Sequence, residues 1–256
     1  IVRDFRDHGG VVLPVDINHS AWDHTLEPLD DPKAVTREGG NAFALRLGLR
    51  QVDGLREEAA KRLVAERGTG FADMHDLYER TRLEVSVLER LAHADAYRSF
   101  GLDRRMALWE VRGLSGYLGQ KASEESLPLF LNEDAGVSTL LPEGEEAVEL
   151  PALLAGEHVH QDYETLRLSL KGHPVSFLRD KLTPRGVLRT RDVEAAANGR
   201  LVTVAGLVLV RQRPGTASGV VFMTLEDETG IANAVLWNTV FNKHRKIVMG
   251  ARMVAI

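Results

Sequence analysis

Apolar and polar positions follow a helical period in the first part of the chain and a strand period in the last. In residues 45–64, an apolar approach and a turn precede a helix whose apolar side chains share one face: Leu55, Ala59, Leu63 and Val64. Gly68 ends this helix as a left-handed cap would. The turn Val52-Asp53-Gly54-Leu55 therefore joins two helical segments, and we predict a helix-hairpin-helix.

Gly54 is the residue on which this predicted hairpin depends. Glycine takes the positive φ of a tight reversal, and it lets a phosphate oxygen approach the backbone, which a side chain would block. The first turn of the following helix favours an anion through its free N–H groups and its dipole. Phosphate contacts do not distinguish one base from another, so this binding is expected to be independent of the base sequence of the nucleic acid. The predicted contact residues are Val52, Gly54, Leu55, Arg56 and Lys61. An ordinary helical hairpin with a glycine turn is the alternative.

Two more helices and a second hairpin follow. Asp73 is expected to cap the first of these helices, and Ser86 and Glu89 have the spacing of a capping box that opens the next. A turn at residues 93–97 then leads into a further helix. Ala94 stands where a glycine is expected, so we predict that this second copy packs against the first without binding phosphate.

The segments on either side of the hairpins carry histidines but no metal pattern. Residues 1–43 begin with a helix at 2–6 and an apolar strand at 11–17, and residues 16–24 contain two aspartates and two histidines. His158 and His160 would share one face of a strand, with no third ligand nearby. Neither spacing matches a metal site, and we assign none.

Residues 113–150 lose periodicity and read as an exposed acidic linker, and residues 151–185 return to helical spacing as a connector. One apolar cluster interrupts the linker: Ser126, Leu127, Pro128, Leu129 and Phe130. Such a segment docks either on its own domain or in the groove of a partner.

From residue 201 the pattern changes to strands, with runs at 201–213, 220–227 and 231–237, a polar helix at 238–247 and a strand at 252–256. Three antiparallel strands, a helix and another strand are the order of an OB-fold, a small barrel that binds single strands on one face. The chain stops before a fifth strand, so the barrel is expected to be incomplete.

The predicted nucleic-acid contacts of the barrel are two arginines, two aromatic side chains and two cations of the helix: Arg211, Arg213, Phe222, Trp237, Lys243 and Arg245. Stacking of a base on an aromatic ring contributes about 1 to 3 kcal/mol. The alternatives are that both aromatic rings belong to the core and that the helix cations form a solvated face.

Composition narrows the class of protein. The chain has 256 residues, 44% of them hydrophobic and 27% charged, with no apolar run long enough for a membrane span and no signal peptide. The absence of cysteine excludes disulfides and suits a reducing cytoplasm, where we expect the protein. A start at Ile1 instead of Met suggests a fragment of a longer protein.

Charge is distributed unevenly around a net value of −5. Residues 123–164 contain eleven acidic side chains and no Lys or Arg, whereas residues 179–256 contain twelve basic and six acidic ones. A nucleic-acid surface is therefore expected in the C-terminal part and not in the middle. Solvated faces of either sign are the alternative.

Four segments carry a resemblance to a known family: Pro14-Val15-Asp16-Ile17-Asn18-His19-Ser20, Leu47-Gly48-Leu49-Arg50-Gln51-Val52-Asp53-Gly54-Leu55, Leu168-Ser169-Leu170-Lys171-Gly172-His173-Pro174 and Thr224-Leu225-Glu226-Asp227-Glu228-Thr229-Gly230. With them the chain resembles the C-terminal half of bacterial C-family DNA polymerases, over nearly all of its length. The segments Asn18-His19-Ser20-Ala21-Trp22-Asp23 and Leu127-Pro128-Leu129-Phe130 are closer to the error-prone, damage-response branch than to the replicative one.

The resemblance implies an α+β multidomain fold with a helical tandem helix-hairpin-helix domain, a linker and a C-terminal, incomplete OB-fold barrel. Residues 1–43 would be the end of the fingers, 44–112 the hairpin domain, 113–185 the acidic linker and connector, and 186–256 the OB-fold. The hairpins would hold duplex product and the barrel single-stranded template. The catalytic carboxylates and their Mg²⁺ belong to a palm domain outside this sequence, so we expect no catalytic residue and no cofactor here.

The resemblance also implies partners. Residues 126–130 are similar to the pentapeptide with which polymerases dock on the sliding clamp, although Ser126 stands where Gln is usual; an accessory mutagenesis protein could supply that contact instead. No membrane partner is expected. The alternative function is a noncatalytic DNA-binding or repair protein that combines the same two modules.

Overall fold

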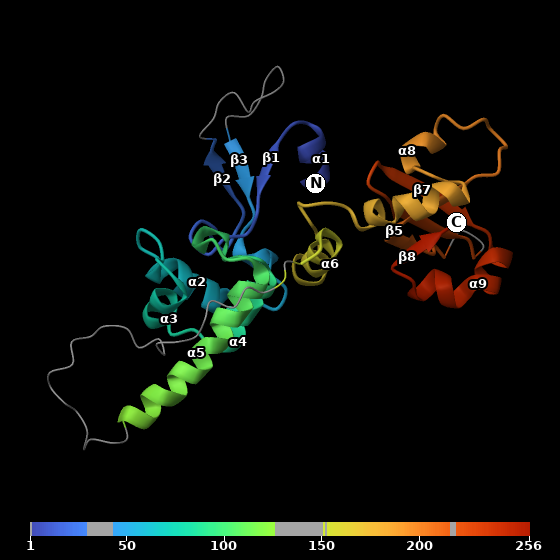
Figure 1. The fold of residues 1–256 in the computed structure, drawn as a ribbon. Coiled ribbons are helices and arrows are strands. Elements are labelled where there is room, and N and C mark those ends of the chain that lie inside the picture. Colours follow the sequence, from blue (N-terminus) through green and yellow to red (C-terminus); the bar gives the residue numbers. More distant parts are fainter. Residues whose placement is uncertain (1, 30–42, 126–150, 152, 216–218) are drawn as a thin grey trace. The chain divides into compact units, whose positions relative to one another are not determined.

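The computed structural model describes residues 2–29, 43–125, 151, 153–215 and 219–256, and it divides the chain into two compact units. Unit 1 covers Ile1–Leu170 and unit 2 covers Lys171–Ile256. In Figure 1 they run from blue to yellow and from yellow to red. Each unit has its own hydrophobic core.

Unit 1 opens with a short helix and a small sheet: α1 (Val2–Asp7), β1 (Val11–Leu13), β2 (Thr25–Pro28) and β3 (Phe43–Arg46). β3 lies between the other two strands, parallel to β1 and antiparallel to β2. The strand expected at residues 11–17 ends at Leu13, because Val15 and Ile17 leave the sheet to enter the helical core. The segment after β1 is thus packed on the hairpins.

The helical part of unit 1 contains the two hairpins: η2 (Leu49–Gln51), α2 (Glu57–Glu66), α3 (Met74–Thr81), α4 (Val85–His93), η3 (Arg98–Phe100), α5 (Arg104–Glu125) and α6 (Ala155–Leu166). Leu63, Leu77, Leu88 and Leu91 are almost completely buried where these helices meet. Asp73 caps α3 as predicted, since its side chain accepts from the Asp76 amide.

Three details of the helices differ from the sequence-based expectations. α4 begins at Val85 with Glu84 as N-cap, so Ser86 lies inside the helix and forms no capping box. α5 continues to Glu125, past residue 113, where the sequence predicts the start of an exposed linker. His158 and His160 lie on the helix α6, not on a strand.

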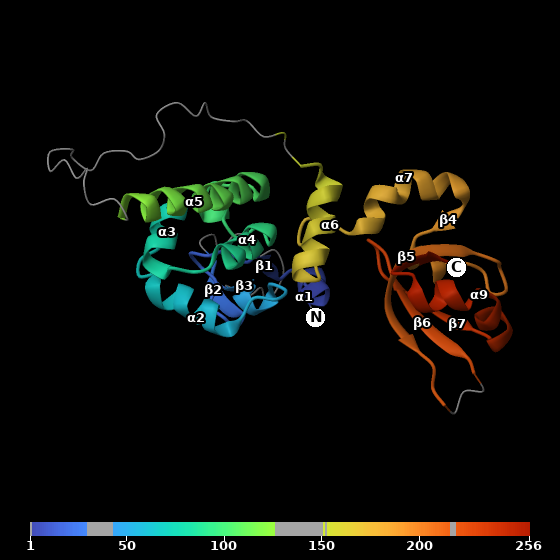
Figure 2. The same cartoon turned by 90° about the horizontal axis from the view of Figure 1, so that it is seen from below.

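Unit 2 consists of a helical lead and a curved sheet: η5 (Pro174–Leu178), α7 (Arg179–Leu182), η6 (Thr183–Arg185), β4 (Val187–Leu188), α8 (Thr190–Val193), β5 (Thr203–Gln212), β6 (Val221–Glu226), β7 (Ile231–Leu236), α9 (Asn238–Gly250) and β8 (Met253–Ala255). The predicted strand, strand, strand, helix, strand order is confirmed. Phe241 and Val248 of α9 join Met223 and Leu225 in the core, with α9 lying beside the sheet in Figure 2.

β5 organises the sheet of unit 2. It pairs antiparallel with β6 and β8 and parallel with the short β4, and β7 continues the sheet from β6. Gly206 lies where the backbone of Glu226 approaches so closely that a Cβ atom would collide with it, which permits the sheet to curve. Among the described residues β7 pairs with β6 alone, so the barrel is not closed.

Candidate nucleic-acid interface

The first hairpin turn has the backbone geometry that its sequence predicts. Gly54 has a φ of +73°, in the left-handed region that glycine enters at little cost. Val52 and Leu55 flank it with buried side chains that anchor the turn in the core. Of the predicted contact residues, these two therefore offer a ligand no exposed side chain, and their role is to hold the turn in place.

The hydrogen bonds of the turn show which backbone groups are free to meet a phosphate. The amide of Val52 donates to the carbonyl of Leu49 (3.0 Å), and the amide of Leu55 donates to that of Val52 (3.2 Å). The amides of Gly54 and Arg56 have no hydrogen-bond partner in the described part of the chain. Arg56 is the N-cap of α2 without a capping side-chain bond, so the first turn of that helix also remains open.

The charges beside this turn are mixed. Lys61 forms an ion pair of 2.9 Å with Glu57, one turn earlier on α2, and this hydrogen-bonded pairing raises the pKa of the lysine. Glu57 and Glu58 lie in the first helical turn, where they compete with a bound anion for the positive end of the dipole. Arg56 is exposed and has no side-chain partner among the described residues, so it contributes an uncompensated charge.

The end of α6 fastens the first hairpin turn, a role that the sequence did not reveal. The amide of Asp53 donates to the Thr165 carbonyl (2.8 Å), and the side-chain amide of Gln51 donates to the carbonyl of Leu166 (2.5 Å). Arg167 has a φ of +61° and pairs with the Asp53 carboxylate at 2.8 Å. Residues from beyond position 150 thus hold the turn from the side.

A buried ion pair ties α6 to the second hairpin. The Arg104 guanidinium, fully buried at the start of α5, binds the Asp162 carboxylate at 2.5 Å. The same guanidinium donates to the carbonyl of His158 (3.2 Å), and the Ser169 hydroxyl donates to Asp162 (2.7 Å). α6 therefore braces both hairpins of unit 1.

In the second hairpin, the residue equivalent to Gly54 is not the one that the sequence indicated. The structural counterpart of Gly54 is Gly101 and not Ala94: each glycine has a φ near +74°, follows a 3₁₀ turn, and precedes a leucine, an N-cap residue and a helix. The difference lies in the N-cap. Asp103 places its own charge there, because its carboxylate accepts from the Met106 amide (2.9 Å) and occupies the position of an external anion.

On unit 2, both predicted aromatic contacts are exposed: Phe222 lies on β6, and Trp237 follows β7 as the N-cap of α9. Phe222 is 42% exposed and Trp237 is 66% exposed, which excludes their assignment to the core. Phe222 pairs in register with Val235 of β7 and Gln212 of β5, so these three side chains share one face. These three side chains give the face an amide, an aromatic ring and an aliphatic group, and no charge.

The predicted cations of unit 2 fall into two groups. Arg211 donates to the Ala251 carbonyl and is half-buried, whereas the exposed Arg213 lies over the Phe241 ring with its guanidinium carbon 4.8 Å from the ring centre. Lys243 and Arg245 are exposed on α9. The first group is thus engaged in packing and the second faces solvent.

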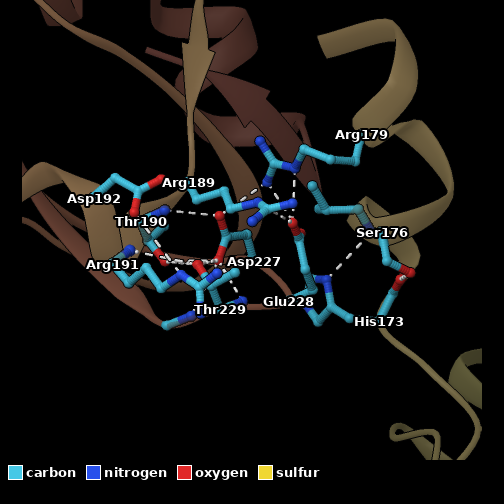
Figure 3. Close-up of polar contacts among 12 residues, drawn as sticks. His173, Ser176, Arg179, Arg189, Thr190, Arg191, Asp192, Asp227, Glu228 and Thr229 are labelled. Carbon is cyan, nitrogen blue, oxygen red and sulfur yellow. Dashed lines mark hydrogen bonds and ion pairs between the residues drawn. The ribbon is translucent and has the colours of Figure 1, made fainter. Parts of the chain in front are cut away.

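A buried polar cluster holds the helical lead of unit 2 against the turn between β6 and β7 (Figure 3). Arg179 binds Glu228 through two nitrogens (2.7 and 3.0 Å) and Asp227 at 3.0 Å. The Asp227 carboxylate also accepts from Thr190 and Thr229. Burial alone would raise the pKa of Asp227, but these hydrogen bonds outweigh it and keep that pKa well below its usual range.

The histidines near the N-terminus take part in local structure. The Nδ1–H of His19 donates to the Asp16 carboxylate (2.8 Å), and His24 accepts from the Gly48 amide. In the part of the chain that the structure describes, no group of three or more His, Cys, Asp or Glu side chains could hold a metal ion.

Residues 126–130, the predicted clamp segment, lie outside the described residues. None of the described helices is long and apolar enough to cross a bilayer.

Sequence comparison agrees with this architecture. Residues 9–107 match the family model of the helix-hairpin-helix motif, and residues 202–256 match that of the OB-fold nucleic acid binding domain. The chain thus combines a helix-hairpin-helix domain with an OB-fold domain, which confirms the predicted fold class.

The whole chain is also similar to part of larger proteins. It is 53% identical to the error-prone DNA polymerase 1 of Rhizobium meliloti (strain 1021), 46% to the error-prone DNA polymerase of Mesorhizobium japonicum and 43% to that of Ruegeria pomeroyi. All of this chain is covered in each case, but only 21 to 23% of the relative. The predicted resemblance to error-prone DNA polymerases is therefore confirmed for the part of these relatives that the chain covers.

Proposed function

We propose that this chain is the DNA-binding region of an error-prone, translesion DNA polymerase, in which the first hairpin grips duplex product and the OB-fold sheet meets single-stranded template. The open amides of Gly54 and Arg56 at a left-handed glycine turn carry the proposal. The names of the relatives favour this function over that of a noncatalytic repair protein.

The grip on duplex would be independent of sequence. Backbone amides and a helix N-terminus bind a phosphate oxygen without contacting a base, so affinity depends on backbone geometry and salt. The turn is held in one conformation by the buried side chains of Val52 and Leu55 and by the hydrogen bonds that the Thr165 and Leu166 carbonyls accept. A turn that is already ordered loses less conformational entropy on binding.

Substitution of the glycine tests this function directly. Gly54→Glu places a carboxylate where the phosphate would lie, and we expect duplex affinity at low salt to fall at least tenfold, equally for duplexes of unrelated sequence. Fluorescence anisotropy with two labelled 20-base-pair duplexes measures the effect. Gly113→Glu, on the exposed surface of α5 with open space around the glycine, is the matched control. Unchanged affinity of Gly54→Glu would refute the assignment.

Nucleotidyl transfer would belong to the whole polymerase. We expect that this chain alone does not extend a primed template, because the metal-binding carboxylates and Mg²⁺ of that reaction are assigned to a palm domain outside this sequence. Metal-dependent primer extension by the purified chain would contradict this.

We also propose that residues 126–130 dock on a sliding clamp. Removal of Leu129 and Phe130 should then abolish binding to a sliding clamp in a pull-down with purified proteins.

A further inference from the structure

An arginine of the second hairpin lies against the turn of the first. Arg90 belongs to α4, and its guanidinium is so close to Gly54 that a Cβ atom on that glycine would collide with Nη1. Both residues are exposed, so the contact lies on the surface where a ligand would approach. Arg90 forms no ion pair and no side-chain hydrogen bond with any residue that the structure describes.

Most other cations at the turn are paired with acidic side chains, whereas the Arg90 guanidinium is not. Lys61 is paired with Glu57, and Arg167 is paired with Asp53, so each of these cations is offset by a neighbouring acid. Arg90 and Arg56 are the two side chains beside the turn whose charge is uncompensated by the described residues. An unpaired guanidinium beside free amides offers a phosphate a planar pair of donors together with a full charge.

We propose that Arg90 is a phosphate-binding residue of the first hairpin, supplied by the helix that opens the second. This inference rests on the proposed function and adds a side chain to a site otherwise made of backbone. It also gives Gly54 a second purpose: besides its positive φ, the missing Cβ leaves the space in which the guanidinium is seated. The two hairpins would then form one site, with the second contributing through α4.

Salt titration separates a phosphate contact from a structural role. For Arg90→Ala we expect duplex affinity to fall about tenfold, and the slope of log K against log salt to decrease by about 0.9, because one phosphate contact is lost. Arg90→Lys keeps the charge and should restore the slope while regaining only part of the affinity. The control Arg6→Ala removes an equally exposed arginine from α1 and should change neither.

A double substitution tests the seat on Gly54. Gly54→Ala would push the guanidinium aside and weaken binding, but in an Arg90→Ala background it should cost less, so the two losses should not add. If Arg90→Ala matches Arg6→Ala while Gly54→Glu abolishes binding, the inference is wrong and the proposed function stands. If Gly54→Glu also leaves duplex binding intact, both fail. Circular dichroism of each variant verifies that the chain is folded.

Discussion

At the scale of single residues, the two hairpins differ in the side chain that begins their helix. Arg56 leaves the first turn of α2 open, whereas Asp103 fills the equivalent position before α5 with its own carboxylate. A carboxylate at a helix N-terminus and a bound phosphate use the same amides and the same end of the dipole. If the first hairpin binds phosphate as proposed, Asp103 is the internal substitute for that ligand in the second.

Neutralising that cap should strengthen duplex binding. Asp103→Ser keeps a side-chain oxygen for the Met106 amide but removes the charge, and we expect affinity to rise about two- to fivefold at low salt. Asp73→Ser makes the same change at the N-cap of α3, remote in sequence from either glycine turn. Anisotropy with one duplex compares them. Equal gains for both variants would show a general charge effect and contradict a local one.

The buried carboxylate of unit 2 makes its stability depend on pH. The pKa of Asp227 is lower in the folded protein than the value of about 3.9 of an unfolded chain, so its contribution is fully present above that value and is lost as the pH falls below it. Asp227→Asn should therefore cost about 2 to 4 kcal/mol at pH 7 and less at pH 3.

Urea unfolding of unit 2 at the two pH values measures this difference. Asp192→Asn, a change of the same kind at an exposed carboxylate on α8, should alter the midpoint little at either pH. A cost of Asp227→Asn that is the same at pH 3 and pH 7 would mean that the carboxylate's charge does not stabilise the cluster.

At the scale of elements, α6 is the part of the fold that binds the two hairpins together. Asp162→Ala would leave the fully buried Arg104 without its counter-charge, and we expect a loss of about 3 to 5 kcal/mol in the stability of unit 1. The Asp53 amide, bonded to Thr165, should also exchange its hydrogen faster. Glu164→Ala, on the exposed side of α6, is the control. Unchanged exchange at Asp53 would show that α6 does not hold the turn.

Elements with local signals were predictable from the sequence, and those fixed by distant contacts were not. The helix after Gly54, the Asp73 cap and the strands of unit 2 follow from period and turn chemistry, and the structure has them. The brace by α6 depends on ion pairs across more than fifty residues, and the seat of Arg90 on Gly54 is a tertiary contact. Neither leaves a pattern in the local sequence.

The same limit explains the misplaced glycine counterpart of the second hairpin. The sequence places the expected glycine at Ala94, directly after α4, but the 3₁₀ turn Arg98–Phe100, the counterpart of Leu49–Gln51 in the first hairpin, comes before the equivalent position, Gly101. The chain approaches this 3₁₀ turn through Asp95, whose positive φ is a backbone state that aspartate tolerates better than most residues.

At the scale of the whole molecule, the two units present surfaces of different chemistry. Unit 1 has open amides and arginines around a turn, suited to phosphates, and unit 2 has the exposed rings of Phe222 on β6 and of Trp237 at the N-cap of α9. Stacking contributes most to single strands, whose bases are exposed, and little to duplex, whose bases are already stacked. Duplex and single-strand binding should therefore respond to different substitutions.

Two variants and two ligands test that separation. Phe222→Ala combined with Trp237→Ala should weaken binding of an oligo-dT strand by about 1 to 3 kcal/mol per stacked base and leave duplex affinity within about twofold. Gly54→Glu should do the reverse. Val240→Ala, also exposed but on α9, controls for loss of apolar surface on unit 2. If Gly54→Glu weakens oligo-dT and duplex alike, both ligands use the hairpin, and the sheet face has another role than binding the template.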